Sequence, residues 1–548
     1  MKKKHFKIGT RGSLLALTQC LQVKKQLEEM SDATYELIII KTEGDENTEK
    51  PLWQMDGKDF FTKELDTALL KGEIDLVVHS YKDLGSERPI GIELAAITQR
   101  KFPHDVLLMR KSVVKELQSR KRSEVLVGTS SPRRMTNLEN YLAPYLPYGE
   151  ELKVKTESLR GNVNTRIKKC KDGAFDAIVL ALPGIERLAL GLPDHQNEAF
   201  EKHGDPREIL GGLLDDFDFM ILPTSTFPAA ASQGALGIEC LEESVDQSEH
   251  GLKRHQELKE ILNKLNHERT IEEVKIERKR FQEFGGGCHL AVGITASKGA
   301  GFLRQSLRGV ADEKIINELS LITEKKQYPK ISKAFIGLST IESFKELDLT
   351  LEKDQVFIKT ACNYKEAIPT DACHDYFFTS PSTVDYGSDL LNLEMNSLWA
   401  SGNKTMKALA SKGLWVNGSA DSLGESTLKI LRESELVKLM KGEPSWKVIT
   451  NNEVENDLGP TIGVYKKEVS KGGQDYLSSL ETCDFYYWTS PTQYQWFKEN
   501  TKLNSKALHG SGLGKTAACL DQDNDLPKDQ RINFSTMTEL KNWLRKNQ

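Results

Sequence analysis

The sequence has no CxxC pair, and its eight cysteines show no regular spacing. Neither a zinc ribbon nor a disulfide framework is indicated, and reduced thiols in the cytoplasm are expected. No run of about 18 apolar residues occurs, so no membrane span is expected. The basic N-terminus leads directly into a strand pattern instead of an apolar signal core. A net charge of -5 argues against a general nucleic-acid-binding protein, although basic residues could still line one cleft.

The 548 residues present are enough for three or four domains, and 38% hydrophobic residues with 28% charged residues are typical of a globular protein. The first half alternates short apolar strands with helical patterns, which predicts an α/β fold with mostly parallel strands. Residues 191–222 are acidic and contain glycine, and we expect them to form an inserted excursion. A polar segment near residues 323–333 is the best linker candidate before the second half.

The second half contains an internal repeat. Thr379-Ser380-Pro381 follows one aromatic strand pattern, and Thr489-Ser490-Pro491 follows another. Each is succeeded by a Lys-Thr pair that opens a helical pattern, at Thr405 and at Thr516. Two similar α/β lobes are therefore predicted. Their helix N-termini could offer amides and hydroxyls to an anion, or the hydroxyl residues could simply cap helices.

Arginines recur where predicted strands give way to predicted helices. Any single one is more often a solvated surface residue, but such junctions meet at one edge of a parallel sheet. Planar guanidinium groups gathered there favour a ligand with several carboxylates or phosphates. The arginines in question are Arg11, Arg133, Arg134, Arg160, Arg166 and Arg187.

Two further segments suggest chemistry. Asp83 lies after the strand pattern that ends at Ser80 and could stabilise a developing cation or move a proton, or it could cap a turn. Cys288 follows three consecutive glycines, which allow backbone angles closed to other residues and leave the thiol open to a bulky group. Alone, Cys288 would more often be a small buried residue in a tight turn. Lys58, in a segment that could cover a cleft, is another candidate anion contact.

Over roughly residues 5 to 310 the chain resembles the porphobilinogen deaminase family, also called hydroxymethylbilane synthases. The resemblance is carried, in the family's order, by Gly9 to Leu17, Lys58, Phe61 to Leu65, Val78 to Asp83, Gly128 to Arg134, Leu159 to Arg166, Ala181 to Arg187, Gln233 to Glu239 and Gly286 to Cys288. It implies two lobes like those of periplasmic solute-binding proteins plus a small α+β domain that carries the cysteine.

The same resemblance implies the chemistry. Cys288 would hold a dipyrromethane cofactor by a thioether, and four porphobilinogen units would be added to it with loss of ammonia, to release hydroxymethylbilane. Asp83 would be the catalytic carboxylate, assisted by Lys82. The implied cofactor contacts are Cys288, Asp83, Ser80, Lys58, Arg133, Arg134, Thr129 and Ser131. The implied substrate contacts are Arg11, Ser13, Gln19, Arg160, Arg166 and Arg187, and no metal is implied.

Residues 334–548 resemble uroporphyrinogen-III synthase, a bilobal α/β family, through the twin Thr-Ser-Pro segments, the Lys-Thr helix starts and Gly463-Val464-Tyr465. Tyr465 matches that family's tyrosine near the substrate. The alternatives are a non-catalytic C-terminal interaction domain or an anion-binding protein without chemistry. The expected division is domain 1 at 1–104 with 222–242, domain 2 at 105–221, domain 3 at 243–325, a linker at 326–333 and the synthase-like region at 334–548. A cytoplasmic monomer that contacts neither membrane nor nucleic acid is expected.

Overall fold

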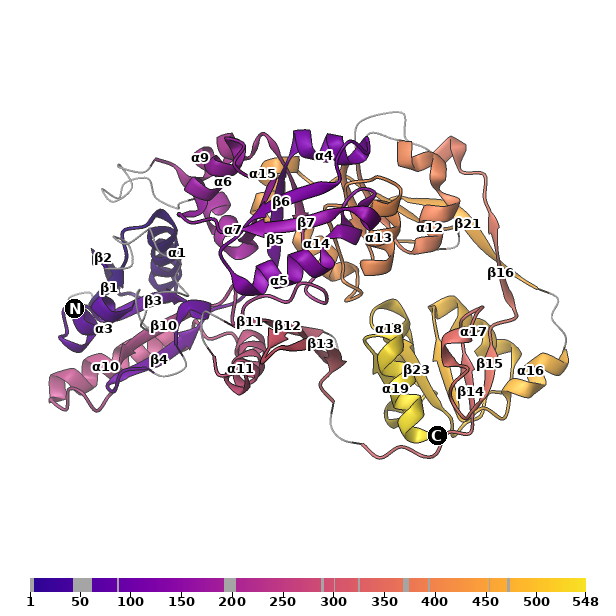
Figure 1. Cartoon of the computed structure of the whole chain (residues 1–548). Helices are drawn as coiled ribbons and strands as arrows, with labels where there is room; N and C mark the ends of the chain where they lie inside the picture. The colour runs from indigo at the N-terminus through magenta and orange to yellow at the C-terminus, as the bar shows by residue number, and fades with distance from the viewer. Residues whose placement is uncertain are drawn as a thin grey trace.

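The computed structural model describes residues 4–42, 62–85, 88–191, 204–286, 290–299, 301–323, 326–367, 374–392, 395–452, 454–470 and 474–548. Five sheets organise these residues. Figure 1 shows the body around β1 at the left and the body around β23 at the lower right, with β5, β6 and β7 at the upper centre, β11, β12 and β13 below them, and β21 at the upper right. Among the described residues, no helix is both long and apolar enough to span a bilayer.

The first sheet has the order β2-β1-β3-β10-β4. Its alternating buried residues pack against helices on both faces, with Phe6 and Ile8 of β1 fully buried. The strands are β1 (His5–Thr10), β2 (Thr34–Ile39), β3 (Leu76–Ser80), β4 (Ile92–Ile97) and β10 (Leu236–Leu241). The helices are α1 (Leu14–Met30), α3 (Lys63–Leu70), α10 (Glu249–Asn263) and the short η2 (Tyr81–Asp83).

The second sheet has the order β7-β6-β8-β5-β9. Its strands are β5 (Asp105–Arg110), β6 (Glu124–Gly128), β7 (Lys153–Glu157), β8 (Ala177–Ala181) and β9 (Phe217–Ile221). Its helices are α4 (Lys111–Gln118), α5 (Pro132–Tyr141), α6 (Val163–Lys171), α7 (Leu182–Leu190), α9 (Pro206–Leu214) and the short η3 (Ala143–Tyr145) and η4 (Gly149–Glu151).

Two predictions about this half are wrong in part. Each of these sheets has two parallel and two antiparallel pairings, because β5 and β10 enter from the other body and run against their neighbours. The expected excursion at 191–222 is also smaller than predicted. Pro206–Leu214 is a helix, and β9 is an edge strand whose Phe217 and Phe219 are buried in the core. Residues 192–203 lie outside the described residues.

The third sheet is antiparallel and has the order β11-β12-β13. Its strands are β11 (Ala291–Gly299), β12 (Phe302–Ala311) and β13 (Lys314–Leu321), and α11 (Glu268–Glu283) packs against β11. A buried ion pair joins this unit to the first sheet, because Arg100 donates to Glu277 at 2.8 Å and to Glu273 at 2.8 Å.

The second half forms two lobes, as the repeat predicts. The near lobe (357–469) contains β16 (Phe357–Ala361), β17 (His374–Phe378), β18 (Met395–Ala400), β19 (Gly418–Ser419), β20 (Trp446–Asn451), β21 (Thr461–Val469), α12 (Pro381–Tyr386), α13 (Asn403–Ser411), α14 (Glu425–Arg432), α15 (Glu435–Lys441) and the short η6 (Lys365–Ala367) and η7 (Ser388–Asn392). Its sheet order is β16-β21-β20-β17-β18-β19.

The far lobe is built from two separate segments of chain, on either side of the near lobe. It contains β14 (Lys333–Ile336), β15 (Thr350–Lys353), β22 (Phe485–Trp488), β23 (Leu508–Gly512), β24 (Arg531–Phe534), α16 (Gln474–Leu480), α17 (Pro491–Asn500), α18 (Lys515–Gln522), α19 (Met537–Asn547) and the short η5 (Glu342–Phe344) and η8 (Lys528–Gln530). Its sheet order is β15-β14-β22-β23-β24.

The helix starts predicted from the repeat are confirmed. Ser380 and Ser490 are the N-caps of α12 and α17, and the two Lys-Thr pairs lie in the first turns of α13 and α18. The predicted linker is too long at its C-terminal end. Ile331 is fully buried in the far lobe, and its N–H donates to the carbonyl oxygen of Asn547 at 2.7 Å.

Candidate functional site

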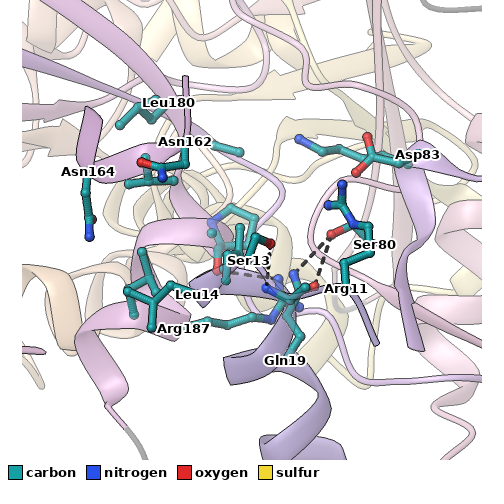
Figure 2. A pocket seen from close by; sticks show the side chains of 18 of the residues that line it. Arg11, Ser13, Leu14, Gln19, Ser80, Asp83, Asn162, Asn164, Leu180 and Arg187 are labelled. Carbon is teal, nitrogen blue, oxygen red and sulfur yellow. Dashed lines mark hydrogen bonds between the residues drawn. The ribbon is translucent and has the colours of Figure 1, made fainter. Parts of the chain in front are cut away.

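A cavity of about 840 Å³ lies between the first and second sheets. Its walls are the segments that follow β1, β3 and β8 and the start of α6. Gln233–Ala235, in the segment that crosses from β9 of the second sheet to β10 of the first, completes them. Figure 2 shows Asp83 and Ser80 on one side of the cavity, with Asn162, Asn164 and Leu180 on the other. Strand ends from two sheets therefore face each other across one open space.

The charges in this cavity are strongly unbalanced. Asp83 is the one carboxylate among the described lining residues. Against it stand Arg11, Lys41, Lys82, Arg134, Arg160, Arg166 and Arg187. The prediction that arginines at strand-to-helix junctions converge is confirmed for five of the six. The space suits a ligand that carries several carboxylates.

Local caps position the walls. Ser13 begins α1, and its hydroxyl accepts from the N–H of Ala16, which fixes the turn behind Arg11. Gln19, one turn further along α1, donates to the hydroxyl of Ser80 at 3.0 Å and so joins α1 to the end of β3. Across the cavity Asn162 caps α6 by accepting from the N–H of Thr165 at 2.9 Å.

Three of the guanidinium groups have no carboxylate ion-pair partner within the described ranges: Arg160, Arg166 and Arg187. Arg166 donates instead to the carbonyl oxygen of Gly161, and Arg187 to that of Gly234, each at 2.7 Å. Burial lowers the pKa of both Arg166 and Arg187 to about 10. Carboxylate groups on a ligand would therefore balance these three positive charges.

Asp105, at the start of β5, organises the floor of the cavity. It accepts from Arg133 at 2.9 Å, from Arg134 at 2.7 Å and from the side-chain amide of Gln233 at 3.0 Å. The two guanidinium groups hold the pKa of Asp105 well below its usual range, although burial alone would raise it. Lys82 Nζ lies 3.5 Å from the Gln233 side-chain oxygen, so the network reaches the opposite wall.

Three predicted contacts lie off the cavity. Arg133 is buried against Asp105 and the carbonyl oxygen of Pro228, and is not a lining residue. Thr129 is buried, with its hydroxyl accepting from the N–H of Ser131, and neither residue lines the cavity. Arg134 does line it, and its buried Nε has no hydrogen-bond partner among the described atoms. Of the two adjacent arginines, Arg134 therefore lines the cavity and Arg133 does not.

Asp83 and Lys82 belong to η2, directly after β3. Asp83 is exposed and lines the cavity, as a carboxylate that meets substrate must. Burial lowers the pKa of Lys82, while the adjacent Asp83 carboxylate partly restores it. Arg278 of α11 fixes this turn by donating to the carbonyl oxygen of Gly85 at 2.7 Å.

The two remaining predicted contacts of this half, Lys58 and Cys288, lie outside the described residues. The residues that lead to Cys288 are described as far as Gly286. Gly285 and Gly286, with φ of 83° and 58°, end α11 in a left-handed conformation that glycine adopts readily. Since Arg278 ties α11 to the Asp83 turn, the helix that leads to Cys288 is anchored beside the cavity wall.

A buried cluster beneath the first sheet has the composition of a metal site. Asp66, His79 and Glu239 bring their donor atoms within 4.8 Å of one another. The guanidinium of Arg88 already donates to Asp66 at 2.6 Å and to Glu239 at 2.5 Å. Arg88 supplies the positive charge there, so the cluster is better explained as a buried ion network.

In the near lobe a cavity of about 540 Å³ is lined by Ala361, Cys362, Asn363, Tyr364, Ala367, Asn452, Thr461, Gly463 and Lys466. Tyr465, the predicted residue, is not among them. Its side chain is 5% exposed and packs against Tyr386, with the ring centroids 5.4 Å apart. The structure therefore places Tyr465 in the core beside the cavity.

A family model described as "Porphobilinogen deaminase, dipyromethane cofactor binding domain" matches residues 6–249. The porphobilinogen deaminase of Nitratiruptor sp. is 34% identical over 343 residues, which are 62% of this chain and 94% of that protein. The chain belongs to the porphobilinogen deaminase family. A probable porphobilinogen deaminase of Methanocaldococcus jannaschii is 36% identical over 291 residues, or 53% of this chain and 82% of that protein.

The family relationship leaves much of the second half uncovered. A solved structure of uroporphyrinogen-III synthetase from Helicobacter pylori is 12% identical and covers 33% of this chain and 83% of that one, with a TM-score of 0.24. A TM-score this low establishes no shared fold.

Proposed function

We propose that the chain is a hydroxymethylbilane synthase, which joins four porphobilinogen molecules with loss of ammonia and releases the linear tetrapyrrole. The observation that carries the proposal is the cavity whose described lining residues include seven basic side chains and one carboxylate. Each porphobilinogen carries an acetate and a propionate, so a growing chain accumulates negative charge. The guanidinium groups of Arg160, Arg166 and Arg187, which have no carboxylate partner among the described residues, would bind these carboxylates as they accumulate.

In this proposal Asp83 is the catalytic group. Its carboxylate would accept hydrogen bonds from pyrrole N–H groups and stabilise the positive charge that develops as ammonia leaves. Lys82 and Arg11 would hold substrate carboxylates on the same wall, while Arg160, Arg166 and Arg187 act from other walls. Ser13, Gln19 and Ser80 would contribute neutral contacts. Arg133 would act indirectly, through Asp105, which it shares with Arg134.

The cavity also suits the dipyrromethane cofactor, which carries four carboxylates. The unpartnered Nε of Arg134 and the arginines without carboxylate partners supply donors of the right kind. We propose that the group is attached to Cys288 and held by Arg134, Lys58, Ser80 and Asp83. Bound there, it would supply the free pyrrole carbon to which the first substrate unit is joined.

Intact mass spectrometry tests the attachment. The purified protein should exceed its encoded mass by two porphobilinogen units less two ammonia molecules. Cys288→Ala should lose this increment, whereas Cys519→Ala, a half-buried thiol in the far lobe, should keep it. An increment that survives Cys288→Ala would refute the attachment, and an unmodified protein with full activity would refute the cofactor.

For the second half we propose the cyclisation of hydroxymethylbilane to uroporphyrinogen III. The two similar units β17-α12-β18-α13 and β22-α17-β23-α18, and the cavity beside β21, support this activity. Incubation with porphobilinogen and analysis of the uroporphyrinogen isomers decides the matter. Predominantly isomer III supports it, whereas predominantly isomer I would mean that the second half is a non-catalytic interaction domain.

The division into domains at 1–104 with 222–242, 105–221 and 243–325 remains part of this proposal, with α10 packed on domain 1 and the second half beginning at Ile331 instead of residue 334. So does action as a monomer in the cytoplasm, with porphobilinogen and hydroxymethylbilane as its small-molecule partners. Equilibrium sedimentation of the full chain checks the oligomeric state.

A further inference from the structure

The near lobe and the second sheet share their hydrophobic core. One cluster joins Leu107 and Met220 of the second sheet to Phe378 and Ile449 of the near lobe. A second cluster joins Phe217 and Phe219 to residues such as Trp399, Leu428 and Val448. Contiguous buried clusters usually mark a single domain core, and a module on a loose tether would keep its core separate. The near lobe contacts the second-sheet body through α13 against η3 and η4, α15 against α7 and α9, and β19 against β9.

The near lobe also forms hydrogen bonds with backbone groups at one edge of the second sheet. Strand β9 is an edge strand, and an open edge exposes unpaired backbone groups. Here the N–H of Ile221 donates to the carbonyl oxygen of Asn417 at 2.8 Å. The carbonyl oxygen of Phe219 accepts from the Trp415 indole at 2.9 Å and from the Asn417 amide at 3.0 Å. The near lobe thus satisfies polar groups that would otherwise be left open.

Asp421 of the near lobe joins two other parts of the deaminase half. Its carboxylate accepts from Arg304 of β12 at 2.7 Å and from the N–H of Ser225 at 2.9 Å. Asp421 and Arg304 are each 2% exposed, so neither charge has water as an alternative partner. Asp421 has a φ of 51°, a conformation that persists at a non-glycine residue only where its surroundings fix it.

Glu186 makes a second junction, beside the cavity. This buried carboxylate on α7 accepts from the N–H groups of Glu435 and Leu436, at 3.0 and 3.1 Å, in the first turn of α15. The next residue, Arg187, lines the cavity. The orientation of α7, and with it the reach of Arg187, therefore depends on a contact with the near lobe.

We propose that the near lobe is a permanent structural part of the deaminase, with Glu186 and Asp421 as positioning residues. Through Glu186 it fixes the helix that presents Arg187 to substrate. Through Asp421 it fixes the third sheet against Thr224 and Ser225, which follow β9. The effect on substrate binding rests on the proposed function of the cavity, whereas the permanent association does not.

Cleavage of the intact protein tests the association without any assay of activity. A protease site inserted after Lys326, which is exposed, would allow the folded chain to be cut between its halves. Gel filtration at high salt should show the cut protein eluting with the uncut protein. Two separate fragments would overturn the proposal, whatever the enzyme does.

Substitution of Asp421 tests the buried junction in the same cut protein. Asp421→Asn should lower the urea concentration at which the halves separate, since it leaves the Arg304 charge buried without its counter-charge. Asp385→Asn, at an exposed position of α12, is the matched control and should leave that concentration unchanged. Equal behaviour of the two variants would remove Asp421 from the proposal.

Kinetics test the positioning role of Glu186. Glu186→Ala should raise the KM for porphobilinogen about fivefold with kcat within about twofold, as expected for one lost hydrogen-bonded junction. Glu186→Gln retains an acceptor and should recover part of the change. Glu208→Ala, exposed on α9, serves as control. An unchanged KM in Glu186→Ala would overturn this role, while absence of turnover in the unaltered protein would instead refute the proposed function.

Discussion

The cavity between the first and second sheets and the near-lobe cavity differ in the charge of their described lining residues. The cavity between the first and second sheets carries seven basic side chains against one carboxylate, whereas Lys466 is the one charged residue among the described lining residues of the near-lobe cavity. A ligand of the first would be attracted mainly by charge, and a ligand of the second mainly by shape and neutral hydrogen bonds, with Lys466 as a single charged contact. A charged site can be recognised in the sequence by its clustered basic residues. A site lined by neutral side chains gives no such signal.

This difference explains why the first site could be predicted from sequence. Guanidinium groups placed just after strands converge because strand ends meet at a sheet edge, as Arg11 and Arg160 illustrate. The same rule could have found Lys41, which follows β2 and lines the cavity. It could not separate Arg133 from Arg134, because both pair with Asp105, and the contact that Arg133 alone makes, with the carbonyl oxygen of Pro228, is distant in sequence.

Contacts between remote segments could not be predicted. Asp421 and Trp415 stand in no motif, and their partners Arg304 and Phe219 belong to other sheets. The antiparallel entry of β5 and β10 was missed for the same reason, since it depends on which body a strand comes from. Periodicity reports local structure, and the pairing of remote edges is decided by packing.

The largest expected effect is at Asp83, the one carboxylate among the described residues that line the charged cavity. Asp83→Ala should keep the fold but lower turnover by about 10²- to 10⁴-fold, the usual contribution of a group that handles charge or protons in the transition state. Steady-state assay with porphobilinogen and thermal unfolding measure the two quantities. Asp32→Ala, exposed and away from the cavity, is the control. A nearly normal rate would remove Asp83 from the mechanism.

A smaller effect is expected from pH. Burial lowers the pKa of Lys82, so this side chain should lose its proton at a lower pH than an ordinary lysine, and binding of substrate carboxylates should weaken there. The ordinary pKa of arginine lies well above that of lysine, so Lys82→Arg should move the alkaline fall of kcat/KM to higher pH, with a difference of up to about tenfold within that window.

The control for the pH profile is Lys25→Arg, an exposed position on α1. Its alkaline fall should coincide with that of the unaltered protein. If Lys82→Arg behaves in the same way, the alkaline fall belongs to another group, and Lys82 is not a substrate contact in its charged form.

The smallest effect should come from the neutral site. Tyr465 is buried against Tyr386 and does not line the near-lobe cavity, so Tyr465→Phe should slow formation of uroporphyrinogen III by at most about fivefold, the value of one hydrogen bond. Tyr364→Phe, at a residue that does line the cavity, gives the comparison. Isomer analysis with supplied hydroxymethylbilane isolates this step from the deaminase. A loss of two orders of magnitude or more in Tyr465→Phe would show that Tyr465 acts in the reaction although it does not line the cavity.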